Sequence, residues 1–385
     1  MPLNYIELKK QVNHLGEATI QRKEDLADRL KRCRELLDEH AGNLVLLQRL
    51  VEEAASREHG LRCAIPVSER LDAHLPIRAG IPDHVLLAAD GSQITPDPHA
   101  AVFYGLVNVG VFRMSTKAGE IPAANSWSEL IFEGENPDDN DFISEDLVSL
   151  RRDTRERQII AELAKKEEAP LVTLTDGPLE LYHEPRDEKA FEAYFKQYLA
   201  ALDELALLNT VTAGYVDRPR AALLTATLEL LVKNGNAKVV GTLKGVTDLM
   251  LMEELLAPGE RSAVFALQFR NAASFEGRKT LHFFYLNVGS ERVPSIARVE
   301  VPQWVVEAPD ALTLLQSVLV EQARQAGASP YPYALTRAHE TAVVKMDEHE
   351  ALDRMIEEEL LARGLPPAVI SQKLANKLIG KRTRY

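Results

Sequence analysis

The stretch LLAADGSQITPD, residues 86–97, places an acid directly after a run of apolar residues. The run over 85–89 has the length and composition of a buried β-strand, and Asp90 and a glycine follow it. Asp-Gly is common in tight turns, so one such pair is more typical of a turn than of a catalytic site. The pattern recurs in PLVTLTDGPLE, residues 170–180, where a second apolar run ends on Asp176. The sequence therefore predicts two buried strands that each deliver an acid at their end.

The ends of strands are where open α/β sheets gather their functional groups. Two carboxylates brought together there repel each other unless a cation lies between them. Carboxylate oxygens are ligands that Mg²⁺ and Mn²⁺ accept. The repeated pattern thus predicts an oxygen-liganded divalent metal held by Asp90 and Asp176, with a plain turn at each position as the alternative.

A third acid is available in SLRRDTRERQIIAEL, residues 149–163, which has the composition of a charged helix. Glu156 lies there among arginines, and Glu162 competes with it because the sequence does not fix the helical phase. In one interpretation this is a salt-bridged face in contact with solvent. In the other, the glutamate reaches the metal while arginines such as Arg152 and Arg155 contact phosphates.

Tyr331 and His339 stand eight residues apart in SPYPYALTRAHETAVV, residues 329–344. A lone histidine on an apolar-flanked helix is usually a core residue. Histidine is also a ready ligand of Mn²⁺. Both interpretations of His339 stay open on the sequence alone.

The order of periodic segments predicts an α/β fold with one mixed sheet from residue 80 onward. Residues 5–58 lack proline and carry apolar residues at helical spacing, which predicts one or two amphipathic helices, broken near Gly42. A linker rich in proline and glycine follows. Strands are predicted at 85–90, 101–112, 171–176, 210–216, 239–244, 263–268, 281–288 and 296–301, and helices at 144–168 with Ser144 as N-cap, 187–208, 219–233, 312–326 and from 333 onward.

The charge balance excludes a general electrostatic affinity for nucleic acid. The 385 residues include 45 Lys and Arg against 58 Asp and Glu, a net charge of −13. So acidic a chain would contact DNA only through a local basic patch, a metal or a partner. The two cysteines form no CxxC pair, the N-terminus lacks the apolar core of a signal peptide, and no apolar run approaches the ~18 residues of a membrane span. We therefore expect a cytoplasmic protein without a membrane segment, a disulfide framework or a zinc site.

The catalytic motifs that the sequence lacks narrow the chemistry further. It contains no GxxxxGK[ST] phosphate-binding loop and no GxSxG nucleophile elbow. Several carboxylates and a histidine suit two-metal phosphodiester hydrolysis, in which metals ~3.5–4 Å apart activate a water and stabilise the leaving oxygen. Any ATP-driven motor must accordingly come from a partner.

Four stretches, in this order, resemble the NurA nuclease family: LAADGSQ, RRDTRERQIIAEL, LVTLTDGPL and YPYALTRAHE. TVTAGYVDRP and VVGTLKG resemble the middle segment of that family, so the resemblance spans roughly residues 85–345. It implies a ribonuclease H-like α/β fold, a mixed sheet flanked by helices, with an N-terminal helical arm and C-terminal helices. The implied segments are the arm and linker over 1–78, the nuclease domain over 79–345, and a C-terminal helical segment with a basic tail over 346–385.

The resemblance also implies an activity. Members of the family are Mn²⁺-dependent DNA nucleases that work with the hexameric ATPase HerA in end resection at double-strand breaks. The resemblance therefore implies Mn²⁺ as the cofactor with Mg²⁺ as a substitute, 5′-3′ exonuclease and/or endonuclease activity, and a homodimer. Pro178 departs from the serine that usually follows the second Asp-Gly of the family, which removes that hydroxyl. The resemblance implies that Asp90, Glu156 and Asp176 are the metal carboxylates. It also implies His339 as a further metal ligand and Tyr331 as a neighbouring site residue.

Two other functions stay open. One is a nuclease-like scaffold that has lost activity and only docks and regulates a HerA-type ATPase. The other is a metal-dependent phosphohydrolase of nucleotides, which would need a small closed pocket where a DNA enzyme needs an open channel. Retention of Asp90, Asp176 and His339 favours the nuclease. The candidate DNA contacts are Arg152, Arg155 and Lys244.

Overall fold

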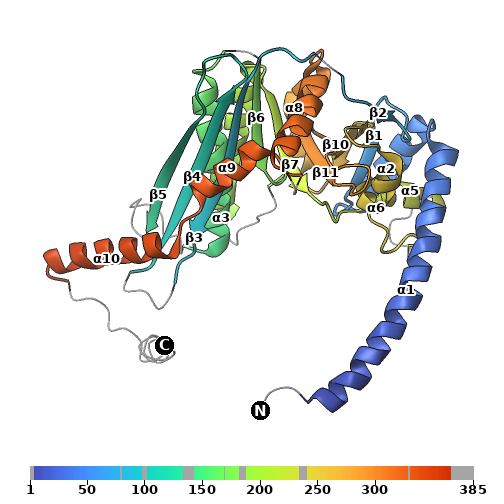
Figure 1. Ribbon diagram of the computed structural model, residues 1–385, viewed down its shortest axis with the longest axis horizontal. Coiled ribbons are helices and arrows are strands. Elements are labelled where there is room, and N and C mark those ends of the chain that lie inside the picture. Colours follow the sequence, from blue (N-terminus) through green and yellow to red (C-terminus); the bar gives the residue numbers. More distant parts are fainter. Residues whose placement is uncertain are drawn as a thin grey trace. The chain divides into compact units, whose positions relative to one another are not determined.

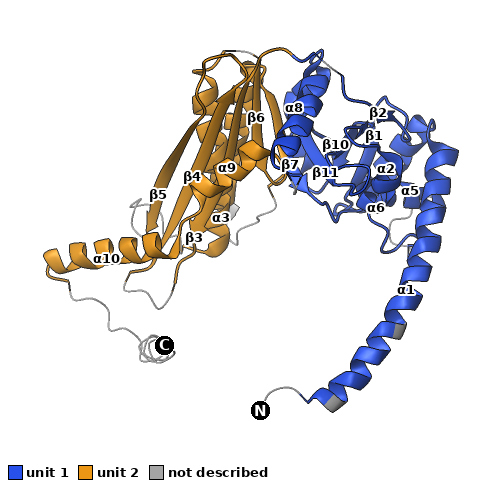
Figure 2. Cartoon of the chain, viewed as in Figure 1, with its two compact units in different colours: residues 1–81, 215–331 blue, residues 82–214, 332–385 orange. Residues whose placement is uncertain are grey.

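The structure is a computed structural model that describes residues 4–78, 80–97, 102–132, 143–168, 170–181, 188–233, 241–327 and 330–365. The chain divides into two compact units (Figure 2). Unit 1 combines Met1–Ile81 with Tyr215–Tyr331, and unit 2 combines Pro82–Gly214 with Pro332–Tyr385. These units do not follow the segments 1–78, 79–345 and 346–385, which were defined by composition and resemblance and stay a prediction. The basic tail lies outside the described residues.

Unit 2 contains a mixed sheet built around β3 (Val85–Ile94) (Figure 1). β3 pairs in parallel with β6 (Leu171–Asp176) and antiparallel with β4 (Tyr104–Ser115). β4 pairs antiparallel with β5 (Ala123–Phe132), and β7 (Val211–Asp217), within which the chain leaves unit 2, lies next to β6. The helices of this unit are α3 (Glu145–Ala164), α4 (Glu188–Leu207), α9 (Tyr333–Ala342) and α10 (Met346–Ala362).

Glycines in β4 show which face of the sheet each helix covers. A Cβ added at Gly105 would lie 2.8 Å from the side chain of Val148 in α3. A Cβ added at Gly110 would lie 2.5 Å from the backbone oxygen of Ala338 in α9. Side chains alternate between faces along a strand, so an odd and an even position point to opposite sides. The sheet of unit 2 is therefore enclosed by α3 on one face and α9 on the other.

Unit 1 combines the N-terminal helices with an antiparallel set of strands. The chain turns between α1 (Tyr5–His40) and α2 (Leu44–Arg57), at the predicted break, and α2 packs with Cys63 and Leu230 in a buried apolar cluster. The strand order is β1-β9-β10-β11, and β2 pairs with β8, which pairs with β10. The strands are β1 (Cys63–Pro66), β2 (His74–Leu75), β8 (Arg261–Ser262), β9 (Phe265–Gln268), β10 (Leu281–Asn287) and β11 (Ile296–Pro302); the remaining helices are α5 (Leu223–Val232), α6 (Asp248–Leu255), α7 (Gln303–Glu307) and α8 (Ala311–Gln325).

Most predicted elements are present, and the exceptions are local. The expectation that the first strand ends at Asp90 is wrong, because β3 continues through the Asp-Gly pair to Ile94. β5 was not predicted, and most of its residues are exposed. Of the predicted strand 239–244, residues 239 and 240 lie outside the described residues and 241–244 form no strand. In the part of the chain that the structure describes, no helix is long and apolar enough to cross a membrane.

Gly110→Ala should loosen the packing of α9 on the sheet. The added Cβ would lie 2.5 Å from backbone atoms of both Ala338 and Ala342, which cannot swing aside as a flexible side chain can. We expect a loss of about 1–3 kcal/mol in the free energy of unfolding, the range typical of an overpacked contact, measured by denaturant unfolding. Gly16→Ala is the control, because a Cβ there meets nothing within 4 Å. A Gly110→Ala protein as stable as the unsubstituted chain would contradict this account.

Candidate active site

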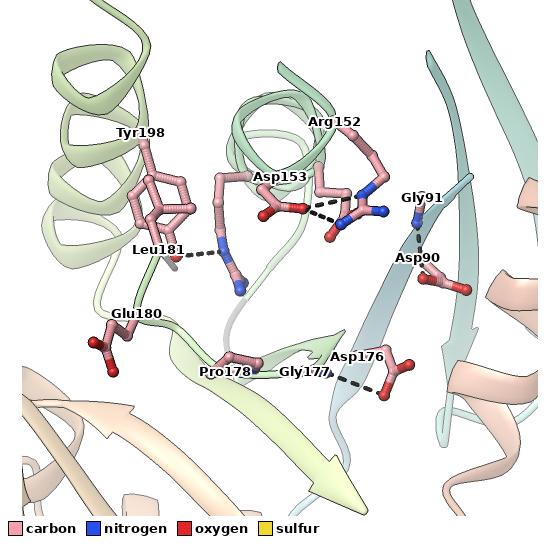
Figure 3. A pocket seen from close by; sticks show the side chains of 12 residues that line it. Asp90, Gly91, Arg152, Asp153, Asp176, Gly177, Pro178, Glu180, Leu181 and Tyr198 are labelled. Carbon is pink, nitrogen blue, oxygen red and sulfur yellow. Dashed lines mark hydrogen bonds and ion pairs between the residues drawn. The ribbon is translucent and has the colours of Figure 1, made fainter. Parts of the chain in front are cut away.

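Asp90 and Asp176 lie side by side on neighbouring parallel strands. The register of β3 and β6 pairs Ala89 with Thr175, so the next residue on each strand is the acid. Neighbouring strands are about 4.8 Å apart. Figure 3 shows both carboxylates projecting to the same side. The structure thus brings together the two acids that the sequence predicted to meet.

The glycine after each acid orients its carboxylate. The backbone N–H of Gly91 donates to Oδ1 of Asp90 at 2.9 Å, and that of Gly177 donates to Oδ1 of Asp176 at 3.1 Å (Figure 3). Gly177 has φ of +84°, a left-handed conformation that favours glycine, and β6 ends there. The second Asp-Gly is therefore a strand end, whereas the first lies within a continuing strand.

His339 reaches the site from α9. Its Nδ1 lies 2.6 Å from Oδ2 of Asp90. The C-terminal end of α9 is fixed by Ser92 and Asn108, whose side chains donate to the carbonyl of Ala342 at 2.5 and 2.6 Å. The His339 side chain is 64% exposed, so the interpretation as a core histidine does not hold. With Nδ1 against a carboxylate, Nε2 is the nitrogen left for a metal, which is how metal-binding histidines are commonly oriented.

The structure distinguishes between the two candidate glutamates of α3. Glu156 is 7% exposed and lines a cavity of about 300 Å³ together with Asp90 and Asp176. Glu162 has a 56% exposed side chain that ion-pairs with Arg155 at 3.5 Å, and it does not line that cavity. Glu156 is therefore the glutamate that the fold brings to the two strand acids.

Glu156 is buried in an environment that disfavours its charge. Burial raises the pKa of the Glu156 carboxyl well above its usual value, and the carboxylates of Asp153 and Asp90 raise it further. The guanidinium groups of Arg152 and Arg157 oppose these effects on the pKa without cancelling them. The cavity thus holds more negative charge than its cations offset, and a proton or a further cation would relieve the excess.

The donor set fits a hard divalent metal in chemistry. Carboxylate oxygens and an imidazole are ligands of Mn²⁺, and the oxygens also suit Mg²⁺. Among the described residues, no three His, Cys, Asp or Glu side chains already converge on one point. The reason is that Asp90 faces α9, whereas Glu156 approaches β3 over Gly91 from α3 on the other face. Metal binding would therefore require side-chain rotation toward the edge where β6 ends.

The other predicted contacts are distributed over both units. Arg152 lines the cavity and pairs with Asp153 at 2.7 Å (Figure 3). Arg155 does not line it and pairs with Glu129 at 3.6 Å. Lys244, in unit 1, is exposed, so its role in binding DNA stays a prediction.

Tyr331 also belongs to unit 1. Its ring meets that of Tyr215 edge-on, with the ring centroids 5.4 Å apart. Its predicted place beside the carboxylates stays a prediction.

Several residues of the cavity were not singled out from the sequence. Asp153 stands three residues before Glu156, so helical periodicity could have suggested it. Arg157 directly follows Glu156, and helical periodicity does not select it. Tyr198 enters from α4 (Figure 3), and no sequence signal connects it with the acids. Pro178, Glu180 and Leu181 complete the wall after β6.

A model of the NurA domain matches residues 84–344, which is more than half of the chain. The chain belongs to the NurA domain family. The crystal structure of the NurA nuclease from Sulfolobus solfataricus is similar to it with a TM-score of 0.52 and 12% identity, over 92% of this chain and 98% of that chain. This likeness shows the fold alone, and it confirms the predicted α/β fold with a mixed sheet flanked by helices and with helices at both ends.

Other solved structures are similar at lower scores. The catalytic domain of human Endonuclease V has a TM-score of 0.31 and 14% identity, over 84% of this chain and 98% of that chain. Drosophila Piwi has a TM-score of 0.29 and 12% identity, over 67% of this chain and 29% of that chain. No match was found among curated protein sequences.

Glu156→Gln should stabilise the metal-free protein at neutral pH. The pKa of Glu156 in the folded state lies above its unfolded-state value of about 4.3. The stability that the protonated carboxyl contributes is therefore fully present below the unfolded-state pKa, and it is lost as pH rises through the folded-state pKa. Glutamine suffers no such loss. We expect the variant to exceed the unsubstituted protein in Tm by more at about pH 7.5 than at about pH 4, in thermal unfolding with a chelator.

The control is Glu162→Gln, which removes an exposed carboxylate from the same helix. Its difference in Tm from the unsubstituted protein should not increase between about pH 4 and about pH 7.5. A Tm difference for Glu156→Gln that stays constant across the pH range would contradict the burial argument.

Proposed function

We propose that the protein is a metal-dependent DNA nuclease that hydrolyses phosphodiester bonds, with Mn²⁺ as its cofactor and Mg²⁺ as a substitute. The observation that carries the proposal is the pairing of Asp90 and Asp176 on adjacent strands, with Glu156 in the same cavity. Family membership and the fold of the NurA nuclease from Sulfolobus solfataricus support nuclease chemistry. The proposed role is DNA end resection in double-strand break repair.

The proposed ligands are Asp90, Glu156 and Asp176, with His339 as a further ligand. When bound, the metal lowers the pKa of a water and offsets charge that develops on the phosphate. Asp90 holds His339 through Nδ1 and so fixes the orientation of the imidazole ring. In the overall reaction a water oxygen forms a bond to phosphorus and the P–O bond to the leaving nucleotide breaks. One proton of the water passes to the leaving oxygen, and the other is released when the new phosphomonoester ionises.

The composition of the cavity favours phosphate chemistry over recognition of a whole nucleotide. Among the described residues that line it, Tyr198 is the one aromatic side chain, so little is present to stack on a base. The charged residues of the wall are Asp90, Arg152, Asp153, Glu156, Arg157, Asp176 and Glu180. A nuclease-like scaffold that only docks the ATPase remains the second candidate, and it predicts no cleavage.

Asp90→Asn and Asp176→Asn should each abolish Mn²⁺-dependent DNA cleavage while the fold is kept. An amide keeps the shape but removes the charge that holds the cation. We expect a loss of at least about 100-fold, because even residues behind the metal ligands commonly cost 10–100-fold. The assay is incubation of single- and double-stranded DNA with Mn²⁺, Mg²⁺ or chelator, with circular dichroism as the check on folding. Glu162→Gln should cleave normally; near-normal cleavage by either aspartate variant would refute the site.

His339→Ala should change the metal preference more than the stability. An imidazole nitrogen favours Mn²⁺ over the harder Mg²⁺, so its loss should weaken Mn²⁺-supported cleavage more than Mg²⁺-supported cleavage. The exposed side chain predicts little change in Tm. Activity titrated against each metal, beside thermal unfolding, measures both effects. A large loss of stability with unchanged metal affinity would instead make His339 a structural residue.

The chain needs a partner in order to move along DNA. Its net charge of −13 limits the number of phosphates that it can neutralise, so its own hold on duplex DNA should be weak. It also lacks a phosphate-binding loop for ATP. We propose a homodimer that docks on a HerA-type hexameric ATPase. Residues 5–58 are the proposed part of the docking surface, and the first turns of α1 carry its exposed apolar residues Tyr5, Val12, Leu15 and Ile20.

Processive degradation of long duplex DNA should require both the ATPase and ATP. Co-elution of the full-length chain and of a chain without the first turns of α1 tests the docking, and a resection assay with and without ATP tests the coupling. We expect the truncated chain to lose co-elution and coupled resection but to keep local cleavage of short DNA. Efficient ATP-independent degradation of long duplex by the isolated protein would refute the coupling, whereas unchanged co-elution after truncation would refute only the role of α1.

A further inference from the structure

Arg157 is a buried cation that forms no ion pair with an acid in the part of the chain that the structure describes. Its side chain is 3% exposed. Its Nε donates to the hydroxyl of Tyr198 at 3.2 Å, one Nη donates to Oγ1 of Thr175, and the guanidinium lies 5.7 Å from the centre of the Tyr198 ring. These partners are neutral. A buried charge without a direct ion pair is costly, so the residue needs a separate explanation.

The other arginines of α3 do have acidic partners. Arg151 pairs with Glu129 at 2.5 Å, and Arg155 pairs with the same glutamate at 3.6 Å. Arg152 pairs with Asp153 at 2.7 Å. Arg157 differs from all three although it is the most deeply buried of them. Among the described residues, the most deeply buried arginine of the helix is therefore the one without an ion pair.

The free part of this guanidinium faces the cavity. Two of its three nitrogens are engaged by Tyr198 and Thr175, and Nη1 has no hydrogen-bond partner within the described residues. Nη1, which has no such partner, is also not fully buried. Arg157 lines the same cavity as Glu156 and Asp176. One hydrogen-bond donor of this guanidinium is thus left for a group that enters the cavity.

We propose that Arg157 is a phosphate-binding residue, which donates to a non-bridging oxygen of a phosphodiester held beside Asp176. The inference rests on the proposed function. Guanidinium is the side chain best suited to phosphate oxygens, and its planar group is held in place here by Thr175 and Tyr198. An anion alone would meet the acids of the wall, so the phosphate enters together with the divalent cation that those acids bind. Arg157 contacts the substrate and not the metal.

Binding of a short single-stranded DNA in Ca²⁺, which should support binding without cleavage, tests the contact directly. We expect Arg157→Met to weaken the Kd by about tenfold or more, the value of one charge-assisted hydrogen bond, while Mn²⁺ affinity measured by spin resonance stays unchanged. Arg157→Lys keeps the charge and should lose less. Lys165→Met is the control, because it removes an exposed cation at the C-cap of the same helix, where Lys165 pairs with Glu204.

A single methylphosphonate, placed in turn at each position of the strand, locates the phosphate. At one position the neutral linkage should erase the difference in Kd between the unsubstituted protein and Arg157→Met. If Arg157→Met fails to fold, Tyr198→Phe removes a partner of the guanidinium and should give a smaller loss of the same kind. Equal Kd values for the unsubstituted protein and Arg157→Met, or loss of Mn²⁺ affinity in that variant, overturn the inference. Arg157-dependent binding by a protein that never cleaves DNA would overturn the proposed function alone.

Discussion

The parallel register of β3 and β6 is the constraint on which the rest of the site depends. It sets Asp90 and Asp176 on adjacent strands, about 4.8 Å apart, where their like charges repel. The apolar run before each acid fixes this register, because a slip of one residue would turn the buried side chains and the acid to the opposite faces. The hydrophobic effect thus holds together two carboxylates that would separate in solution. A cation bound between them would reduce their repulsion and stabilise the site.

Glycine has a different role here from the one its position beside an acid suggests. Gly91 does not form a turn; it lies within β3, where an added Cβ would collide with Oε1 of Glu156 and come within 2.6 Å of Cγ of Arg152. Gly110, on β4, admits α9 in the same way from the other face. Both helices can therefore approach the backbone closely enough to bring Glu156 and His339 to the strand acids.

This arrangement explains which parts of the site the sequence could predict. Asp90 and Asp176 follow apolar runs, and that local pattern was sufficient to place them together. Glu156 and Glu162 could not be separated, since the face of α3 that meets β3 is decided by tertiary packing. β3 also continues past Asp90 through residues of low strand propensity, because its pairing with β4 extends to Ile94 and overrides that propensity. β5 escaped prediction for the related reason that little of it is buried.

The electrostatics of the cavity point to a pair of ions. Burial and the neighbouring carboxylates raise the pKa of Glu156, and a cation would stabilise these acids, while Arg157 is buried beside them without an ion pair among the described residues. A cation alone would leave the guanidinium unpaired, and an anion alone would be repelled by the acids. A divalent metal bound to a phosphate oxygen would place a cation beside the carboxylates and an anion beside Arg157. The site is therefore complementary to a metal–phosphate pair, and such a pair would let so acidic a chain carry out the proposed reaction without a broad basic surface.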